Sequence, residues 1–185
     1  MPEPDGKGRI RCFSCARPGL YRRSSPGVNY FSDMQISHVK YFQTWIPIIA
    51  KWIYDEWSYA FPTRDLQEIQ RGLFGRINEA EMPITLVAHD ERGVLGTASL
   101  KASDMDILPE LTPWLSSVFV HPDHRGMGVA KALADEIEKI ARQAGYRKLY
   151  VFNPITKGVF EKLGWSVLQT IPYAGKEIAI LVKDL

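Results

Sequence analysis

The 185-residue sequence has two cysteines, a net charge of +2 and no long apolar run. Two cysteines are too few for a disulfide framework, so nothing indicates an oxidising compartment and we expect a cytoplasmic location. The small net charge gives no reason to expect a polyanionic partner such as a nucleic acid. Without an apolar run of about 20 residues we expect no membrane span, and the N-terminus lacks the apolar core of a signal peptide.

The two cysteines, Cys12 and Cys15, have the spacing of a metal-ligand pair. A structural zinc site needs four ligands, and the sequence has neither a second cysteine pair nor a His-x-x-x-His to complete the set. A thioredoxin-like redox motif would need a strand before it and a helix after it, and neither pattern flanks the pair. We therefore predict no metal site and treat both cysteines as incidental.

Residues 1–33 are rich in Gly, Pro, Ser and Arg and poor in core material. This composition predicts a flexible, basic N-terminal tail, and an arm for nucleic acid or a membrane surface is the less favoured alternative. The remaining segment, 34–185, has the length of one α/β domain. Because Met34 begins a segment typical of a domain start, one hypothesis is that the preceding residues are an upstream extension, which mass spectrometry of the native N-terminus would test.

The most informative stretch is 114–131, which predicts a strand, a turn and a helix in that order. Residues 115–120 are apolar and β-branched enough for a buried strand, and Pro122 cannot continue a central ladder. The helical spacing of apolar residues begins at Met127, so two glycines lie at the helix N-terminus. Free N–H groups and the positive end of the helix dipole meet there, and glycines let an anion approach the backbone. The stretch therefore predicts a cradle for a pyrophosphate.

The cradle also resembles the acyl-CoA-binding signature of the GNAT superfamily of acetyltransferases, Arg/Gln-x-x-Gly-x-Gly/Ala. Arg125, Gly128 and Ala130 fill its fixed positions, and Gly126 fits a common variant. The segment 153–165 resembles the last helix of the family and the strand after it, Asn…Phe-Tyr-Glu-Lys-Leu-Gly-Phe. The two motifs agree in order and spacing, and the resemblance covers nearly all of the sequence after the tail.

Two other interpretations of the glycines fit less well. A tight strand-to-helix turn whose glycines only permit close packing is the plainer alternative. A dinucleotide-binding fingerprint would need a third glycine where the sequence has Lys131, and it would not tolerate turn residues after the strand.

The resemblance implies the GNAT fold: an α/β domain whose central twisted sheet of about seven strands is mixed and mostly antiparallel, with flanking helices and splayed middle strands. In similar enzymes the helical region that follows Pro62 covers the acceptor pocket. On the helix after the cradle, Asp135/Lys139 and Glu138/Arg142 are spaced as i,i+4 pairs, which we expect on the solvent side. Besides the stretch above, periodicity predicts helices over 44–57 (with Thr44 as N-cap) and 62–77, and strands over 35–39, 84–89, 94–101, 148–152, 165–169 and 177–182.

The resemblance also implies where the donor, acetyl-CoA, binds. Its pantetheine arm would lie in a V-shaped opening, where the strand ending at Val120 separates from the strand over 148–152. A backbone N–H at Val118 or Phe119 would polarise the acetyl carbonyl, and the cradle would hold the pyrophosphate. The residues expected to bind the donor are Val118, Phe119, Val120, Arg125, Gly126, Met127, Gly128, Val129, Ala130, Lys131, Asn153 and Phe160.

The acceptor amine must lose a proton, which calls for a base. The polar loop over 103–113 offers Glu110 first, then Asp106 and then Asp104. In similar enzymes acidic groups from this region face the acceptor amine directly or through water, and they can also attract a cationic substrate. Solvated turn residues are the alternative interpretation of these carboxylates.

The departing thiolate must gain a proton, which calls for an acid. Many family members carry a tyrosine for this purpose where the present sequence has Phe160, which has no hydroxyl. Tyr173, expected on a loop, is the candidate substitute, whereas Tyr150 lies in a predicted strand and is more typical of packing.

The sequence therefore predicts an enzyme, an acetyl-CoA-dependent N-acetyltransferase that acts on a primary amine. The acidic loop favours a small, polyamine-like or aminoglycoside-like acceptor, and a protein or peptide amine is an alternative. The missing tyrosine leaves a second alternative, a weakly catalytic acyl-CoA-binding regulatory module. We expect a small-molecule partner, no nucleic acid and no membrane, and a homodimer stays open because dimers are common in similar proteins.

Overall fold

The computed structural model describes residues 34–59, 64–77, 82–154 and 159–185. In these residues the strands form a seven-stranded sheet in the order β1-β2-β3-β4-β5-β7-β6. Neighbouring strands are antiparallel except β4 and β5, which are parallel, so the predicted mixed and mostly antiparallel sheet is confirmed. The predicted tail over 1–33, with Cys12 and Cys15, lies outside the described residues.

The predicted elements are all present, but the helix predicted over 62–77 is shorter and the strand predicted over 165–169 is longer than expected. The strands are β1 (Gln35–His38), β2 (Ile84–Asp90), β3 (Gly93–Lys101), β4 (Trp114–Val120), β5 (Lys148–Pro154), β6 (Ser166–Tyr173) and β7 (Lys176–Asp184). The helices are α1 (Ile46–Trp57), α2 (Leu66–Phe74), α3 (Val129–Gln143) and α4 (Val159–Lys162), with 3₁₀ turns η1 (Val39–Trp45) and η2 (Pro122–His124).

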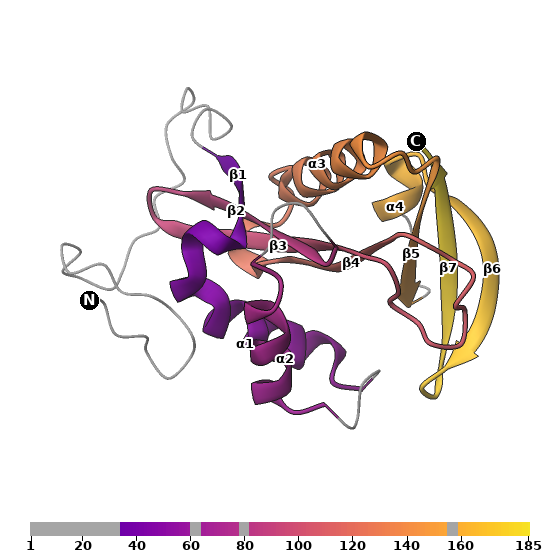
Figure 1. The fold of residues 1–185 in the computed structure, drawn as a ribbon, viewed down its shortest axis with the longest axis horizontal. Coiled ribbons are helices and arrows are strands. Elements are labelled where there is room, and N and C mark those ends of the chain that lie inside the picture. Colours follow the sequence, from indigo (N-terminus) through magenta and orange to yellow (C-terminus); the bar gives the residue numbers. More distant parts are fainter. Residues whose placement is uncertain (1–33, 60–63, 78–81, 155–158) are drawn as a thin grey trace.

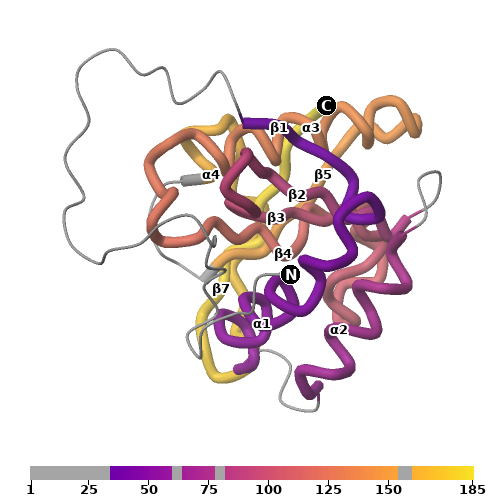
Figure 2. The backbone as a smooth tube through the Cα atoms, turned by 90° about the vertical axis from the view of Figure 1, so that its left-hand side faces the viewer, coloured from indigo at the N-terminus to yellow at the C-terminus, as the bar shows by residue number. Residues whose placement is uncertain are grey.

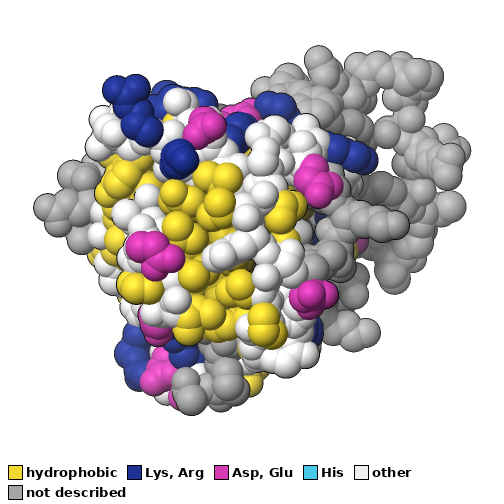
Figure 3. Space-filling model, turned by 90° about the vertical axis from the view of Figure 1, so that its right-hand side faces the viewer, with side chains coloured by type: hydrophobic (Ala, Val, Ile, Leu, Met, Phe, Trp, Pro, Cys, Tyr) yellow, Lys and Arg dark blue, Asp and Glu magenta, His cyan; other side chains and the backbone are white. Residues whose placement is uncertain are grey.

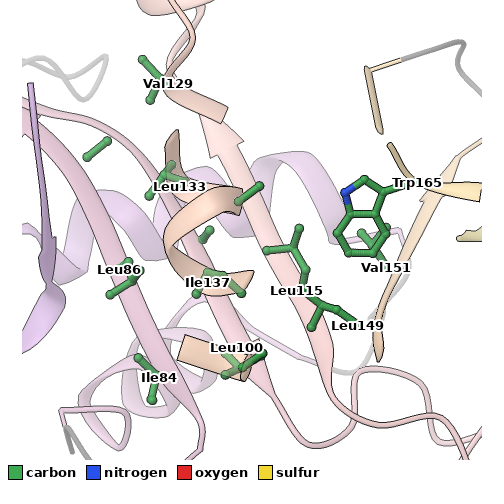
Figure 4. Packing of buried hydrophobic residues seen from close by; sticks show 14 of the residues in the cluster. Ile84, Leu86, Leu100, Leu115, Val129, Leu133, Ile137, Leu149, Val151 and Trp165 are labelled. Carbon is green, nitrogen blue, oxygen red and sulfur yellow. The ribbon is translucent and has the colours of Figure 1, made fainter. Parts of the chain in front are cut away.

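Helices cover both faces of the sheet (Figure 1). α3 lies on one face, and α1 and α2 lie together on the opposite face, which is also clear from the perpendicular view (Figure 2). Leu133 and Ile137 of α3 pack onto Leu86, Leu100 and Leu115 of three neighbouring strands (Figure 4). Burying each such side chain contributes about 1.5–3 kcal/mol, so this layer fixes the position of the helix that carries the predicted cradle.

The predicted start of the first long helix was wrong. Thr44 is not its N-cap: residues 39–45 form η1, and α1 begins at Ile46 with no side-chain cap. Phe42 interrupts the 3₁₀ turn with φ −132° and ψ 44°, and Pro47 occupies the first turn of α1, where its missing N–H costs nothing. The helix therefore starts where proline permits it to start.

The expected solvent-side position of Glu138 was also wrong. Glu138 is only 4% exposed, and its carboxylate accepts from Lys183 of β7 at 2.7 Å as well as from Arg142 at 3.5 Å. The Lys183 ammonium also donates to the backbone carbonyl of Leu163 at 2.8 Å. The pair therefore ties α3 to β7 and to the end of α4. The expected Asp135–Lys139 pair is replaced by Lys131–Asp135 and Glu136–Lys139 pairs.

Candidate active site

The sheet splits between its two parallel strands. β4 and β5 pair at one position, Trp114 opposite Tyr150, and the Tyr150 N–H donates to the carbonyl of Pro113 at 3.0 Å. Beyond this point the strands diverge, because β4 stays paired with β3 and β5 stays paired with β7. The divergence opens a cavity of about 670 Å³, and the predicted splayed strands are confirmed.

A β-bulge shapes the β4 side of this cavity. Between two paired positions β3 advances from Thr97 to Ser99, while β4 advances three residues, from Ser116 to Phe119. Ser117 absorbs the extra residue with φ 55°, a left-handed value that is uncommon for a residue with a side chain. The bulge leaves Ser117 and Val118 without a register partner in β3, at the side of β4 that borders the opening.

The bulge brings to the cavity two residues that the sequence analysis missed. Ser116 and Ser117 line the cavity together with Val118, and their hydroxyl oxygens are 3.2 Å apart. Two consecutive serines inside an otherwise apolar strand were the available signal. Phe119 and Val120, which were expected to bind the donor, do not line the cavity. The ring of Phe119 stacks on Trp52 of α1 with centroids 5.1 Å apart.

The predicted cradle lies after β4, at the N-terminus of α3. Gly126 and Gly128 both have φ 77°, and Gly128 is the N-cap of the helix. No side chain caps this terminus and no acidic residue lies in its first turn, so nothing in the helix itself competes with an anion. An added Cβ at Gly126 would meet no atom within 4 Å, which leaves the left-handed backbone as the reason for glycine there.

Two cations flank the cradle. The Nε of Arg125 donates to the carbonyl of Val120 at 3.1 Å, and its guanidinium lies 5.9 Å from the ring centroid of Phe119. Lys131 forms an exposed pair with Asp135 one turn further along the helix. These residues fit a pyrophosphate: free backbone N–H groups, a favourable dipole and positive charge converge on one exposed turn.

The opposite wall of the cavity comes from the helices α1 and α2 and from the end of β3. α1 contributes Ile53 and Trp57. α2, the region expected to cover the acceptor pocket, contributes Glu68, Ile69, Arg71 and Gly72, so this region does line the cavity. α2 begins with a capping box between Asp65 and Glu68, which holds its first turn in place. The polar residues of this wall are Arg64, Glu68, Arg71, Arg76, Lys101 and Asp104.

An ion pair and a guanidinium lie at the inner end of this wall. Lys101 donates to the carboxylate of Asp104 at 2.6 Å, and burial lowers the pKa of Lys101 while Asp104 acts in the opposite sense. Arg76 donates to the hydroxyl of Ser99 at 3.4 Å, and that hydroxyl also bonds the Thr85 hydroxyl at 2.9 Å. Burial likewise lowers the pKa of Arg76, and Asp104 opposes this shift.

Of the three candidate base residues, one lines the cavity and two do not. Asp104, the third candidate, lines the cavity, whereas Glu110 and Asp106 are exposed and lie outside its lining. Tyr173, the candidate acid, is the last residue of β6 and not part of a loop as expected. Burial and then the carboxylates of Asp106 and Asp104 raise the pKa of Tyr173, and its side chain packs against the cluster that contains Met105 of the same loop. Like Glu110 and Asp106, Tyr173 lies outside the cavity lining. Their catalytic roles stay predictions.

Both residues predicted from the motif over 153–165 line the cavity. These residues are Asn153 of β5 and Phe160 of α4. The Phe160 ring packs edge-on against Trp165 with centroids 5.7 Å apart. The position that carries tyrosine in the family motif is therefore occupied by a phenylalanine that is part of the cavity lining.

The sequence matches the model of the acetyltransferase (GNAT) family over residues 46–165. An N-acetyltransferase from Staphylococcus aureus Mu50 is 18% identical, with a TM-score of 0.63, over 83% of this chain and 99% of that chain. A putative acetyltransferase from Salmonella typhimurium, solved with acetyl-CoA, is 18% identical with a TM-score of 0.65 over 83% and 94%. A ribosomal-protein-alanine N-acetyltransferase from Brucella melitensis is 20% identical with a TM-score of 0.65 over 82% and 99%. No curated protein matches the sequence.

The family match and the shared fold agree on one class of protein. The chain belongs to the GNAT family of acetyltransferases, and it is an acyltransferase that uses acetyl-CoA. Within the described residues, no helix is long and apolar enough to cross a membrane. In the same part of the chain, no group of three or more His, Cys, Asp or Glu side chains could hold a metal ion.

Proposed function

We propose that this protein is an N-acetyltransferase that moves the acetyl group of acetyl-CoA to a small primary amine. The observation that carries the proposal is that one cavity is lined both by the diverging strands β4 and β5 and by the helices α1 and α2. Its volume of about 670 Å³ suits the reactive end of the donor together with a small acceptor. The two reactants can therefore meet beside the bulge of β4.

The proposed reaction forms one bond and breaks one. The neutral amine nitrogen attacks the acetyl carbonyl carbon, a carbon–nitrogen bond forms, and the carbon–sulfur bond breaks. The nitrogen loses one proton and the departing sulfur gains one, so the products are an amide and a free thiol. Acetyl-CoA supplies the activated thioester, and the protein supplies position and polarisation.

In this proposal the β4 backbone polarises the carbonyl. The N–H of Val118 or Phe119 is the donor; the bulge leaves Ser117 and Val118 without a register partner in β3, whereas Phe119 is paired with Thr97. The cradle from Gly126 to Lys131 holds the pyrophosphate, supported by its uncapped helix N-terminus.

Proton transfer requires a base for the amine and an acid for the departing thiolate. Asp106 and Glu110 do not line the cavity, so as bases they would act through water. Phe160 cannot donate a proton, and Tyr173 is the substitute acid that we propose. Because a thiol is already a fair leaving group, the missing tyrosine slows the reaction and does not abolish it.

A protein or peptide acceptor and a weakly catalytic acyl-CoA-binding module are the alternatives. The Brucella melitensis enzyme that shares this fold is named for a ribosomal-protein alanine. Short peptides are therefore included among the acceptors to be screened. Phe160 is the feature that supports the regulatory module. A cytoplasmic location stays a prediction.

A homodimer is the assembly that we expect. β6 is an edge strand, and its Val167 and Leu168 are 51% and 48% exposed. Figure 3 views the molecule from the side of β6 and β7, where hydrophobic side chains gather on the surface. Light scattering coupled to gel filtration should give twice the monomer mass, and a monomer at micromolar concentration would contradict the expectation.

A thiol-release screen with acetyl-CoA across free amines, polyamines, aminoglycosides and short peptides tests the proposed function. Gly126→Glu places a carboxylate in the cradle and should raise the KM for acetyl-CoA at least tenfold. Gly145→Glu is the matched control, since Gly145 has φ 87° at the other end of α3 and also has open space around it. Equal acetyl-CoA kinetics for the two variants would show that the cradle is misassigned. Donor binding without thiol release from any amine would favour the regulatory module.

A further inference from the structure

The cavity wall formed by α1, α2 and the end of β3, here called the acceptor wall, carries more positive than negative charge. Among the residues that the structure describes, this wall has four cationic side chains and two carboxylates. The cations are Arg64, Arg71, Arg76 and Lys101, and the carboxylates are Glu68 and Asp104. A pocket for a polyamine or an aminoglycoside needs the opposite balance, since like charges in a partly enclosed site repel.

One of the two carboxylates is already balanced by a protein cation. Lys101 and Asp104 are 2.6 Å apart, and their side chains are only 13% and 5% exposed. Asp104 is therefore a poor attractor for a cationic substrate, because its charge is compensated within the wall. Glu68, the other carboxylate, caps the first turn of α2 by accepting from the backbone N–H of Asp65 at 3.3 Å.

Arg76 makes no ion pair of its own within the described residues, and Asp104, which acts on it electrostatically, is already paired with Lys101. Its guanidinium donates to the neutral hydroxyl of Ser99, and within the described residues no carboxylate lies within ion-pair distance of it. A guanidinium has five N–H groups in a planar fork, so one long hydrogen bond leaves most of them for a ligand. A half-buried charge of this kind is stabilised by a partner of opposite sign.

We propose that the acceptor is a small zwitterionic amine, whose carboxylate binds Arg76 while its amino group faces the bulge of β4. This inference rests on the proposed acetyl transfer and names its substrate class. A carboxylate accepts two parallel hydrogen bonds from a guanidinium. The positive charge of Arg76 also favours the neutral form of a neighbouring amine, which is the form that attacks. It thereby reduces the need for a strong base in the cavity lining.

The substrate side of the test needs no variant. Thiol release and isothermal titration calorimetry with the CoA-saturated protein are run on matched pairs: β-alanine, γ-aminobutyrate and the standard amino acids, each against its methyl ester. Spermidine and kanamycin represent polycations. For at least one pair, the zwitterion should exceed its ester roughly 10- to 100-fold in kcat/KM and in affinity, as expected for charge-assisted hydrogen bonds.

The protein side uses Arg76→Gln and Arg76→Lys, each checked for folding by circular dichroism. The glutamine variant should remove the preference of zwitterion over ester, mainly through KM, and the lysine variant should keep part of it because it keeps the charge. Arg147→Gln is the control, since Arg147 is an exposed arginine outside the cavity lining, and it should leave the preference unchanged.

The outcomes separate this inference from the function on which it rests. If zwitterions bind better than esters but no amine releases thiol, the proposed transfer fails and the anion subsite stands. If esters, spermidine or kanamycin are acetylated as well as zwitterions, acetyl transfer stands and the inference is overturned. It is also overturned if the preference survives in Arg76→Gln, or if acidic peptides are preferred over every free amino acid.

Discussion

Replacing Gly96 with alanine tests how closely β3, β4 and α3 pack around the donor site. Gly96 lies opposite Val120 in the ladder between β3 and β4. An added Cβ would lie 2.6 Å from the carbonyl oxygen of Phe119 and 3.2 Å from Cγ1 of Val129, the first residue of α3. The first contact involves backbone, so it cannot be relieved by rotating a side chain.

The magnitude follows from this geometry. To reach ordinary contact, β4 or the N-terminus of α3 must move by several tenths of an ångström inside a packed core. Overpacking of this kind costs about 1–3 kcal/mol, so we expect the free energy of unfolding in urea to fall by about 2 kcal/mol. For a domain of this size, the melting temperature should fall by about 4–8 °C. The KM for acetyl-CoA should also rise, because the displaced segment joins the bulge to the cradle.

Gly72→Ala is the matched control for this prediction. The nearest atom to an added Cβ at Gly72 is Nη2 of Arg76 at 4.0 Å, and the residue lies inside α2. Alanine there meets no clash and should stabilise the protein by about 0.5–1 kcal/mol through its helix propensity. If Gly96→Ala melts within about 1 °C of the parent protein, the close approach of the three elements is refuted.

Three further predictions concern the core, the leaving group and pH. Glu138→Gln leaves Lys183 without its buried partner and should lower the free energy of unfolding by about 3 kcal/mol. Glu136→Gln removes an exposed pair and should change it by less than about 1 kcal/mol, so equal losses would contradict the buried pair. Phe160→Tyr restores a hydroxyl at the cavity wall and should raise the turnover of thiol release about tenfold, and unchanged turnover would discard the missing acid as an explanation. Burial lowers the pKa of His89, so its neutral form stabilises the fold above pH 6.5, and this contribution is lost as pH falls through the lowered pKa. Urea titrations between pH 7.5 and pH 5 should show stability falling by at most about 1.4 kcal/mol per pH unit from this group, with a shallower decline in His89→Gln; parallel declines would rule His89 out.

The parts of the site that the sequence predicts are those set by local chain chemistry. Gly126 and Gly128 follow a strand pattern and open a helix pattern, so neighbouring residues alone indicate the cradle. The position of Phe160 in a recognisable motif likewise indicates a wall of the donor site. These features depend on spacing along a short segment, which the sequence displays directly.

The parts that the sequence did not predict depend on contacts between distant segments. The bulge at Ser117 is a mismatch in register between β3 and β4, and neither strand reveals it alone. Arg76 and Ser99 are 23 residues apart in the sequence, and Lys183 and Glu138 are 45 residues apart. The charged cavity wall and the buried ion pair therefore arise only when the chain folds. A loop rich in carboxylates is a weak guide to the cavity, because only Asp104 lines it and Lys101 neutralises that residue.

Because β4 and β5 pair at a single position, the sheet consists of two parts, here called leaves, that are joined only at this position. Trp114 and Tyr150 form this joint, with ring centroids 5.9 Å apart, and the indole is fully buried and donates to the Leu111 carbonyl at 2.6 Å. One leaf carries the bulge and the cradle, and the other carries β5, β7 and β6. The angle between the leaves sets the width of the opening that we propose for the donor. A substitution at the joint can therefore stop catalysis while every residue that contacts either substrate stays in place.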